Sequence, residues 1–243
     1  MSEKRNWIFL RGLTRGNIHW GDFPGVFQSM HPDDEVEFLE IPGNGLLFNE
    51  LTPVDPETLV KLLSFRSRFI KEGQKVHLCG ISLGGMVALK WAELLPSQVL
   101  SVTIINCSLK QFSSFYQRLN PTYYRKIIST LFSNNALIQE QVVLSITSNR
   151  AEKYDRYLHK FAEFSKHHPV TKKNFFNQLL LASRIKISSL HVPLKVISAI
   201  NDRLVSQICS SEIAVNLKGK LVIHPMAGHD LPLDEPEWLA QQL

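Results

Sequence analysis

The sequence GISLG at residues 80–84 has the G-x-S-x-G spacing that can present a reactive serine on a tight turn. An apolar run at 76–79 precedes it, and an uncharged run typical of a buried helix start follows it. A sharp turn from strand to helix strains the serine backbone, and the flanking glycines remove side chains that would clash. The hydroxyl would then stand over the positive end of a helix, which favours a negative oxygen. The pattern predicts Ser82 as a nucleophile; the alternative is a glycine-rich turn with a solvated serine.

A serine hydroxyl is a weak nucleophile, so it needs a base to take its proton and a carboxylate to orient that base. Both should lie on loops that follow strands, because the carboxyl ends of parallel strands meet at one edge of the sheet. Asp202 follows an apolar run that ends at Ile200, and His229 lies in the loop after the run at 221–224. These positions predict Asp202 as the orienting acid and His229 as the base. The alternatives are a turn or helix cap for Asp202 and a surface position for His229.

Two neighbours of the predicted base also carry titratable side chains. His224 is the rival base, and we expect its position at a strand end beside Pro225 to fix its ring. Asp230 is expected to face solvent or to cap the last helix. Neither residue is therefore assigned to the chemistry.

A negative oxygen formed during acyl transfer needs two backbone donors. One is predicted to be the N–H of Leu83, which directly follows the serine. The other should come from the loop after the first strand, where Gly12 lets the backbone approach closely. We assign the N–H of Leu13 as this second donor; the alternative for this loop is an ordinary glycine turn.

Apolar runs alternate with amphipathic segments over most of the chain. Strands are predicted at 7–10, 36–41, 76–79, 99–106, 194–200 and 221–224, and the main helices at 55–73, 85–95, 206–216 and from 234 onward. This alternation is typical of an α/β domain with a mainly parallel sheet.

The alternation stops between residues 108 and 190. Helix starts are predicted there at Asn120, Asn134-Asn135, Asn149 and Thr171, from their capping side chains or a following proline. We interpret this segment as four short amphipathic helices between two strands. The predicted organisation is a core of residues 1–107 and 191–243 with a helical insertion, a lid, at 108–190.

The composition is that of a soluble globular protein. The 243 residues are 44% hydrophobic and 20% charged, and no apolar run has the length that spans a membrane. The N-terminus shows no signal-peptide pattern. The three cysteines, Cys79, Cys107 and Cys209, form no CxxC pair, as is typical of buried thiols in a reducing compartment. We therefore expect a cytoplasmic protein.

No motif in the chain indicates a cofactor. There is no G-x-x-x-x-G-K-[ST] loop and no G-x-G-x-x-G after a predicted strand. The pair His167-His168 has no third ligand at metal spacing, which favours a solvated basic face. The sequence thus predicts neither a metal nor an organic cofactor.

From about Trp7 onward the chain resembles the α/β-hydrolase superfamily, with a helical lid at 108–190. Within it, the chain is similar to small bacterial carboxylesterases of the pimeloyl-acyl-carrier-protein methyl ester esterase type. The matching pieces are Arg11-Gly12-Leu13, Ile41-Pro42-Gly43-Asn44-Gly45, the turn at 80–85, Ala199-Ile200-Asn201-Asp202 and Ala227-Gly228-His229.

The chain departs from that family at two places. The family usually has His-Gly where this chain has Arg11-Gly12, and that histidine orders the loop without doing chemistry. The chain also starts only six residues before its first predicted strand, so about six of the eight strands of the full fold are expected.

The resemblance implies a serine hydrolase that cleaves a carboxylic ester or thioester through an acyl-enzyme. Ser82 would attack, His229 would hold the proton, and Asp202 would orient the histidine. One alternative is acyl transfer to another alcohol or thiol with the same residues. The other is a binding protein that keeps the hydrolase scaffold without turnover.

The predicted insertion is strongly basic. It holds thirteen Lys and Arg against four acids, a net charge of +9, while the whole chain is +5. One interpretation is a set of solvated outer helix faces. The other is a surface for an acidic partner, such as an acyl-carrier protein, a coenzyme A thioester or an anionic lipid headgroup. Nothing else in the chain indicates nucleic acid.

Overall fold

Six parallel strands form a single sheet in this computed structural model, which describes residues 4–243 and leaves the side chains of 151–154 undescribed. The strand order is β2-β1-β3-β4-β5-β6, and every neighbouring pair is parallel. The bounds are β1 Asn6–Leu10, β2 Glu35–Leu39, β3 Val76–Ile81, β4 Val99–Ile105, β5 Leu194–Ala199 and β6 Lys220–His224. The predicted α/β fold with about six strands is confirmed.

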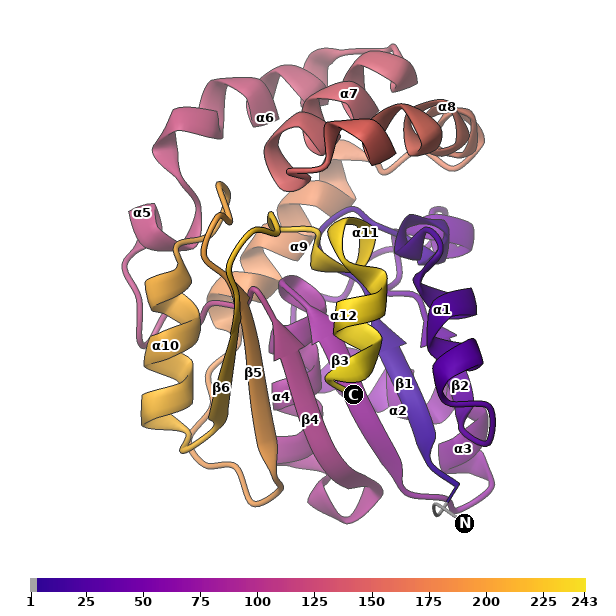
Figure 1. The fold of residues 1–243 in the computed structure, drawn as a ribbon, viewed down its shortest axis with the longest axis vertical. Coiled ribbons are helices and arrows are strands. Elements are labelled where there is room, and N and C mark those ends of the chain that lie inside the picture. The colour runs from indigo at the N-terminus through magenta and orange to yellow at the C-terminus, as the bar shows by residue number, and fades with distance from the viewer. Residues whose placement is uncertain (1–3) are drawn as a thin grey trace.

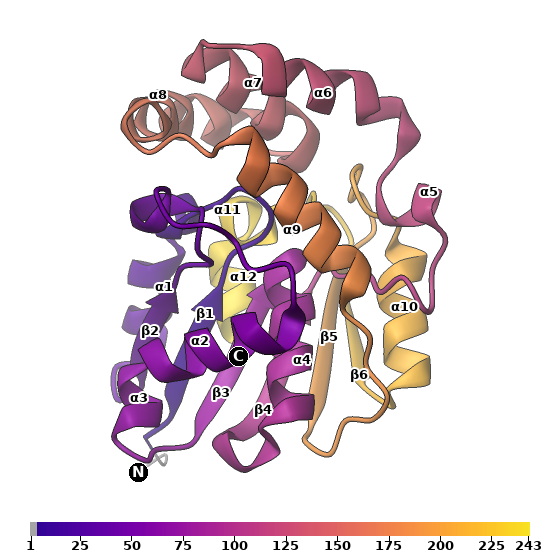
Figure 2. The same cartoon turned by 180° about the vertical axis from the view of Figure 1, so that it is seen from behind.

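Helices cover both faces of the sheet. Figure 1 shows α1 and α12 in front of it, and Figure 2 shows α2 and α4 on the opposite face. The helices of the core are α1 Phe23–Met30, α2 Pro56–Arg66, α3 Arg68–Lys71, α4 Leu83–Leu94, α10 Gln207–Asn216, α11 Leu231–Asp234 and α12 Pro236–Gln241. Short 3₁₀ turns are η1 Asn17–Trp20, η2 Gly45–Leu47 and η3 Pro96–Gln98.

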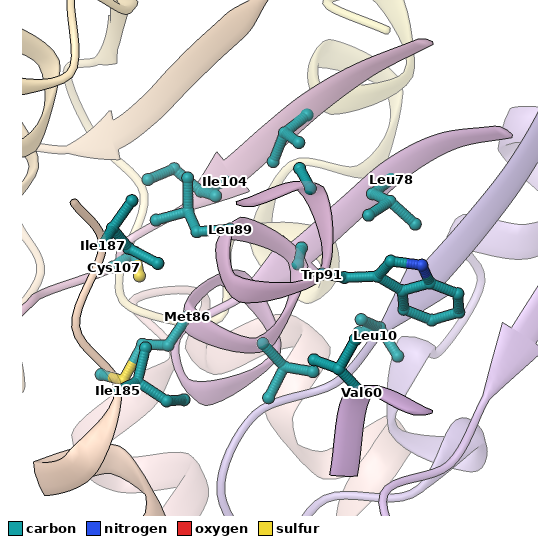
Figure 3. Close-up of a cluster of buried hydrophobic side chains, with 14 of the residues drawn as sticks. Leu10, Val60, Leu78, Met86, Leu89, Trp91, Ile104, Cys107, Ile185 and Ile187 are labelled. Atoms are coloured by element: carbon teal, nitrogen blue, oxygen red, sulfur yellow. The ribbon is translucent and has the colours of Figure 1, made fainter. Parts of the chain in front are cut away.

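The alternation of side chains along β1 divides the core into two layers. Ile8 and Leu10 join the cluster under α2 and α4, whereas Trp7 and Phe9 join the cluster under α1 and α12. Successive strand residues point to opposite faces, so a strand buried on both sides is apolar throughout. Trp91 of α4 lies in the first cluster (Figure 3), and its indole N–H donates to Gln98 at 3.0 Å.

Five helices lie between β4 and β5, within the helical insertion of residues 108–190. They are α5 Phe115–Arg118, α6 Tyr124–Phe132, α7 Ala136–Thr147, α8 Ala151–His167 and α9 Lys172–Arg184, with η4 Pro121–Tyr123 before α6. In Figure 1, α6, α7 and α8 lie above the sheet, and Figure 2 shows α9 descending from them onto the core. Ile185 and Ile187, which follow α9, pack beside Met86 in the first cluster (Figure 3), so the returning segment is anchored there.

The cap residues explain most of the helix starts in the insertion. Asn120, Asn135 and Thr171 each accept a backbone N–H with the side chain, as predicted. The start predicted at Asn149 lies one residue early, because Arg150 is the cap of α8. The single helix predicted at 55–73 is divided into α2 and α3 by the extended residue Ser67. The four-residue helices α5 and α11 were not predicted, since so short a segment shows no period.

In the part of the chain that the structure describes, none of the helices has the length and apolar character needed to cross a bilayer.

Candidate active site

The predicted strained turn is present between β3 and α4. Ser82 is the cap of α4 and has φ 53° and ψ −118°, a conformation that L side chains rarely adopt. A Cβ on Gly80 would overlap the backbone of Gly84, and a Cβ on Gly84 would overlap the carbonyl of Leu10. Only glycine fits at both positions, and the serine stays partly exposed at the tip. The turn therefore presents the hydroxyl at the end of β3, as a nucleophile requires.

Asp202 and His229 are in direct contact although 27 residues separate them. Nδ1 of His229 lies 2.7 Å from Oδ2 of Asp202, and both side chains are almost fully buried. Oδ1 of Asp202 accepts the N–H groups of Leu204 and Val205 at 2.8 and 2.9 Å. The carboxylate thus caps its own loop with one oxygen and binds the histidine with the other. This contact favours the tautomer with the proton on Nδ1, which leaves Nε2 as the basic nitrogen.

The environment of His229 raises its pKa above the usual 6.5. Burial alone lowers the pKa, because it disfavours the charged ring. The charge of Asp202 and the hydrogen bond to it outweigh burial, with a smaller contribution from Asp230. An imidazolium formed here is stabilised, which is the requirement for a base that takes a serine proton.

Asn106 connects the segments that carry the three predicted residues. It follows β4 with φ 46°, and its Nδ2 donates to the carbonyls of His229 and Gly228 at 2.8 and 3.2 Å. Its Oδ1 accepts the N–H of Ala199, at the end of β5, at 2.8 Å. The carbonyl of Ile105, one residue earlier, accepts the N–H of Ser82 at 2.9 Å.

The backbones of Ser82 and His229 are therefore both tied to the end of β4. Among the described residues, the Ser82 hydroxyl and the His229 ring share no direct hydrogen bond. Such contacts are often loose without substrate and tighten in the complex. Sequence reasoning missed Asn106; the available signal was an amide side chain directly after a buried strand, at the edge where the site lies.

The loop after β1 meets the serine as predicted. A Cβ on Gly12 would lie 3.2 Å from the Cβ of Ser82, so Gly12 passes directly over the nucleophile. Among the described residues, no acceptor pairs with the N–H of Leu13 or of Leu83. Two unpaired backbone donors beside a serine have the chemistry of an oxyanion hole.

Gln178 of α9 binds the loop that follows β1. Thr14, with φ 59°, donates its N–H to Oε1 of Gln178 at 2.8 Å. Nε2 of Gln178 donates to Asn44 at 2.8 Å, and the side chain is completely buried. The helical insertion therefore shapes the loop that carries Leu13. No local pattern marks Gln178, because its partners lie more than a hundred residues away.

The expectation for Asp230 is wrong: its side chain is buried, with 3% of the residue exposed. It forms a two-pronged ion pair with Arg11, with Nη1–Oδ1 at 2.9 Å and Nη2–Oδ2 at 2.6 Å. Burial raises the pKa of Asp230, but Arg11 outweighs it and the net shift is downward. Arg11 also lies over the ring of Trp20, 5.0 Å from its centroid. The carboxylate of Asp230, which was expected to face solvent, therefore joins the loop after β1 to the loop of His229.

His224 is fixed in place and is a poor base. Its Nδ1 accepts the N–H groups of Met226 and Ala227 at 3.2 and 2.9 Å. Burial lowers its pKa, and its ring packs edge-on against Trp238. The ring supports the turn that leads to His229.

The segment that connects α7 to α8 contacts the loops of Asp202 and His229 directly. The carbonyl of Thr147 accepts the N–H of Asp230 at 2.8 Å, and a Cβ on Gly228 would lie 2.6 Å from that carbonyl. Asn149 donates to the carbonyl of Asn201 at 2.9 Å. Gly228 is therefore needed for the close approach of the helical insertion to the base loop.

Solved structures with the same architecture cover almost the whole chain. A lipase described as putative from Acinetobacter baumannii AYE is 18% identical, with 100% of this chain and 83% of that chain covered and a TM-score of 0.75. A lipase-esterase related protein from Clostridium acetobutylicum is 17% identical, with coverage of 99% and 93% and a TM-score of 0.75. The enol-lactonase from Burkholderia xenovorans LB400 is 14% identical, with coverage of 99% and 90% and a TM-score of 0.76.

At these identities the likeness shows the fold. No curated protein sequence matches the chain. A family model described as the alpha/beta hydrolase fold matches residues 17–236, a span that includes Ser82, Asp202 and His229. Since this match covers most of the 243 residues, the chain belongs to the α/β-hydrolase family.

Proposed function

We propose that this protein is a serine hydrolase that cleaves a carboxylic ester or thioester through an acyl-enzyme on Ser82. The observation that carries the proposal is the buried contact of 2.7 Å between His229 and Asp202, at the sheet edge where the strained turn presents Ser82. A binding protein would need neither a buried imidazole–carboxylate pair nor a strained serine.

In the proposed mechanism, Ser82 Oγ attacks the acyl carbon while Nε2 of His229 takes its proton. The negative oxygen of the tetrahedral intermediate is bound by the N–H groups of Leu13 and Leu83. The imidazolium, stabilised by Asp202, then gives its proton to the leaving alcohol or thiol. Water, activated by the same histidine, releases the acid and restores the serine. Every step uses groups of this chain and the substrate, so the proposal requires no metal or organic cofactor.

The substrate class is inferred from chemistry and from the structural neighbours. These neighbours are described as a lipase, a lipase-esterase related protein and an enol-lactonase, classes that share cleavage of an acyl–oxygen bond. We include thioesters, because the same triad releases a thiol at least as readily. The finer resemblance, to esterases that cleave the methyl ester of pimeloyl-acyl-carrier-protein, names one substrate within this class. We propose a lid role for residues 108–190, because Gln178 shapes the loop that carries Leu13. We propose a cytoplasmic location on a separate ground, since the three cysteines are buried free thiols.

The test is hydrolysis of a series of p-nitrophenyl esters from acetate to palmitate by the wild type and by Ser82→Ala. The wild type should turn over at least part of the series, and its preferred chain length measures the acyl site. The variant should lose on the order of 10³-fold or more in kcat while remaining folded. A folded variant that keeps more than a tenth of the activity would remove Ser82 from the mechanism.

A further inference from the structure

Helix α6 carries an apolar stripe that the described residues do not bury. Its residues Tyr124, Ile127, Ile128, Leu131 and Phe132 lie on one side of the helix, and Lys126, Ser129 and Thr130 lie on the other. No residue of α6 is buried, and Ile128 and Phe132 are 53% and 72% exposed. A helix in a soluble protein normally gains its stability by burying such a stripe. The stripe of α6 therefore lacks a cover within the described residues.

Helix α9 continues this exposed surface. Its buried side packs on the core through Phe175, Gln178 and Leu181, while Phe176 and Leu180 on the other side are 58% and 41% exposed. The two helices meet where Lys172 Nζ lies 4.5 Å from the ring centroid of Phe132. Figure 2 shows both helices on the same side of the molecule.

We call this surface the α6–α9 face. It consists of the exposed apolar side chains of the two helices and the exposed cations beside them: Ile128, Phe132, Phe176, Leu179, Leu180, Arg125, Lys172 and Lys173.

The charge on the α6–α9 face has a single sign. Neither helix contains an acidic residue, and the sequence has none from 108 to 139 or from 164 to 201. In the part of the chain that the structure describes, Arg125, Lys126, Lys172 and Lys173 form no ion pair. Three of these unneutralised cations, Arg125, Lys172 and Lys173, lie on the side of the exposed phenylalanines, and together they attract a partner that is anionic and apolar at once.

We propose that the α6–α9 face docks on the surface of an anionic lipid bilayer. A bilayer offers anionic headgroups to the lysines and, a few ångströms deeper, an apolar layer to Phe132, Ile128 and Phe176. Each basic residue near such a surface strengthens binding by about 5-fold, and each buried apolar side chain strengthens it further. An acidic soluble protein would satisfy the cations and leave the row of exposed rings in water.

The position of the α6–α9 face relates docking to catalysis. Gln178 of α9 binds the N–H of Thr14 on one side of the helix, while Phe176 and Leu180 are exposed on another. One helix therefore separates the docking surface from the loop over Ser82. If the proposed function holds, docking places the nucleophile beside esters that reside in the membrane; the docking itself does not depend on catalysis.

The test measures co-sedimentation with vesicles, using protein that carries Ser82→Ala so that no lipid is hydrolysed. Vesicles of phosphatidylcholine alone are compared with vesicles of equal parts phosphatidylcholine and phosphatidylglycerol. We expect binding to the anionic vesicles to be at least about 10-fold tighter, and to weaken as salt is added. Equal binding to both vesicle types, or to neither, overturns the proposal.

Two double variants separate the contributions of charge and apolar surface. Lys172→Glu with Lys173→Glu should weaken binding by about 10- to 100-fold, since two favourable charges become unfavourable. Phe132→Ser with Phe176→Ser should weaken it by about 10-fold or more through lost apolar burial. Unchanged binding by either folded variant overturns docking of the α6–α9 face on a bilayer.

The matched control uses the same kind of pair on the core. Phe65 at the end of α2 is 74% exposed, and Lys71 Nζ lies 5.4 Å from its ring centroid. Figure 2 shows α2 and α3 away from the helical insertion. Phe65→Ser with Lys71→Glu should bind vesicles like the parent protein. A loss equal to that of the α6–α9 variants would mean that binding is not localised. If the protein forms a dimer that Phe132→Ser dissociates, a second copy of the chain covers the α6–α9 face. That result would overturn the proposal.

Discussion

The side-chain amide of Asn106 donates a hydrogen bond of 2.8 Å to the backbone carbonyl of His229. The same side chain accepts the N–H of Ala199, three residues before Asp202, at 2.8 Å. Asn106 therefore fixes the loop of His229 relative to the end of β5, the strand that precedes Asp202. Its own φ of 46° is tolerated by asparagine more readily than by most residues. Asn106 acts as a positioning residue for the proposed triad.

Replacing Asn106 by aspartate should slow catalysis more than it destabilises the fold. The variant keeps the acceptor for Ala199 but turns a carboxylate oxygen toward the carbonyls of Gly228 and His229. The displaced histidine should lower kcat by about 10- to 100-fold with little change in KM, because small misplacements of a catalytic group are costly. The control is Asn174→Asp, at a buried asparagine that likewise accepts one N–H and donates to one carbonyl. If both variants lose kcat equally, Asn106 has only a structural role.

The pH dependence of activity should follow the ionisation of His229. The base must be neutral to accept the serine proton, so kcat/KM rises with pH through the pKa of His229. Burial lowers that pKa, but the charge of Asp202 and the hydrogen bond to it, with Asp230, outweigh burial, so the midpoint should lie above 6.5.

Asp202→Asn removes the charge and leaves burial as the dominant influence on the ring. The residual activity, lower by about 10⁴-fold, should therefore show its midpoint at a lower pH than the wild type. A midpoint that stays in place or moves upward would mean that Asp202 does not govern the ionisation of the base.

The two histidines near the site should respond differently to substitution. His229→Ala should remove ester hydrolysis, because the proposed mechanism has no second base for Ser82. His224→Asn should keep most of the activity, since the amide oxygen can replace Nδ1 as acceptor for the N–H groups of Met226 and Ala227. Steady-state kinetics on one p-nitrophenyl ester decides between them, and the reverse pattern would make His224 the base.

Stability should depend strongly on a buried ion pair that joins the helical insertion to the core. Arg15 Nη1 lies 2.7 Å from Glu140 Oε2, and both side chains are more than nine-tenths buried. Ser165 of α8 donates to the other oxygen of Glu140 at 2.8 Å. Burial raises the pKa of Glu140, but the charges and hydrogen bonds of Arg15 and His19 together outweigh burial, so the net shift is downward and the carboxylate stays ionised.

Glu140→Gln leaves the guanidinium of Arg15 buried without its counter-charge. We expect a loss of about 3–5 kcal/mol in the free energy of unfolding, measured by urea denaturation. The control is Glu50→Gln, in a half-exposed pair with Arg66 at 2.7 Å, where the loss should be at most about 1 kcal/mol. Equal losses from the two substitutions would mean that the buried pair does not anchor the insertion.

Local patterns predicted the strained turn at Ser82, the alternation of strands and helices, and the caps at Asn135 and Thr171, because each rests on residues adjacent in sequence. The placement of Asp202 and His229 followed from topology, since parallel strands bring their ends together.

The ion pair of Arg11 with Asp230 could not be predicted in this way. It joins residues 219 positions apart, and each looks like a solvated loop charge in its own context. Gln178 and Asn106 were missed for the same reason: their hydrogen-bond partners come from distant loops that only the folded chain brings together. The least predictable features of the candidate site are thus the long-range contacts that position the catalytic groups.

The claim that Ser82 forms the covalent intermediate is tested most directly by labelling with a fluorophosphonate, followed by proteolysis and mass spectrometry. The account predicts one adduct per chain on the peptide that contains Ser82, and none in Ser82→Ala. Labelling of a different residue, or equal labelling of the wild type and Ser82→Ala, would contradict it.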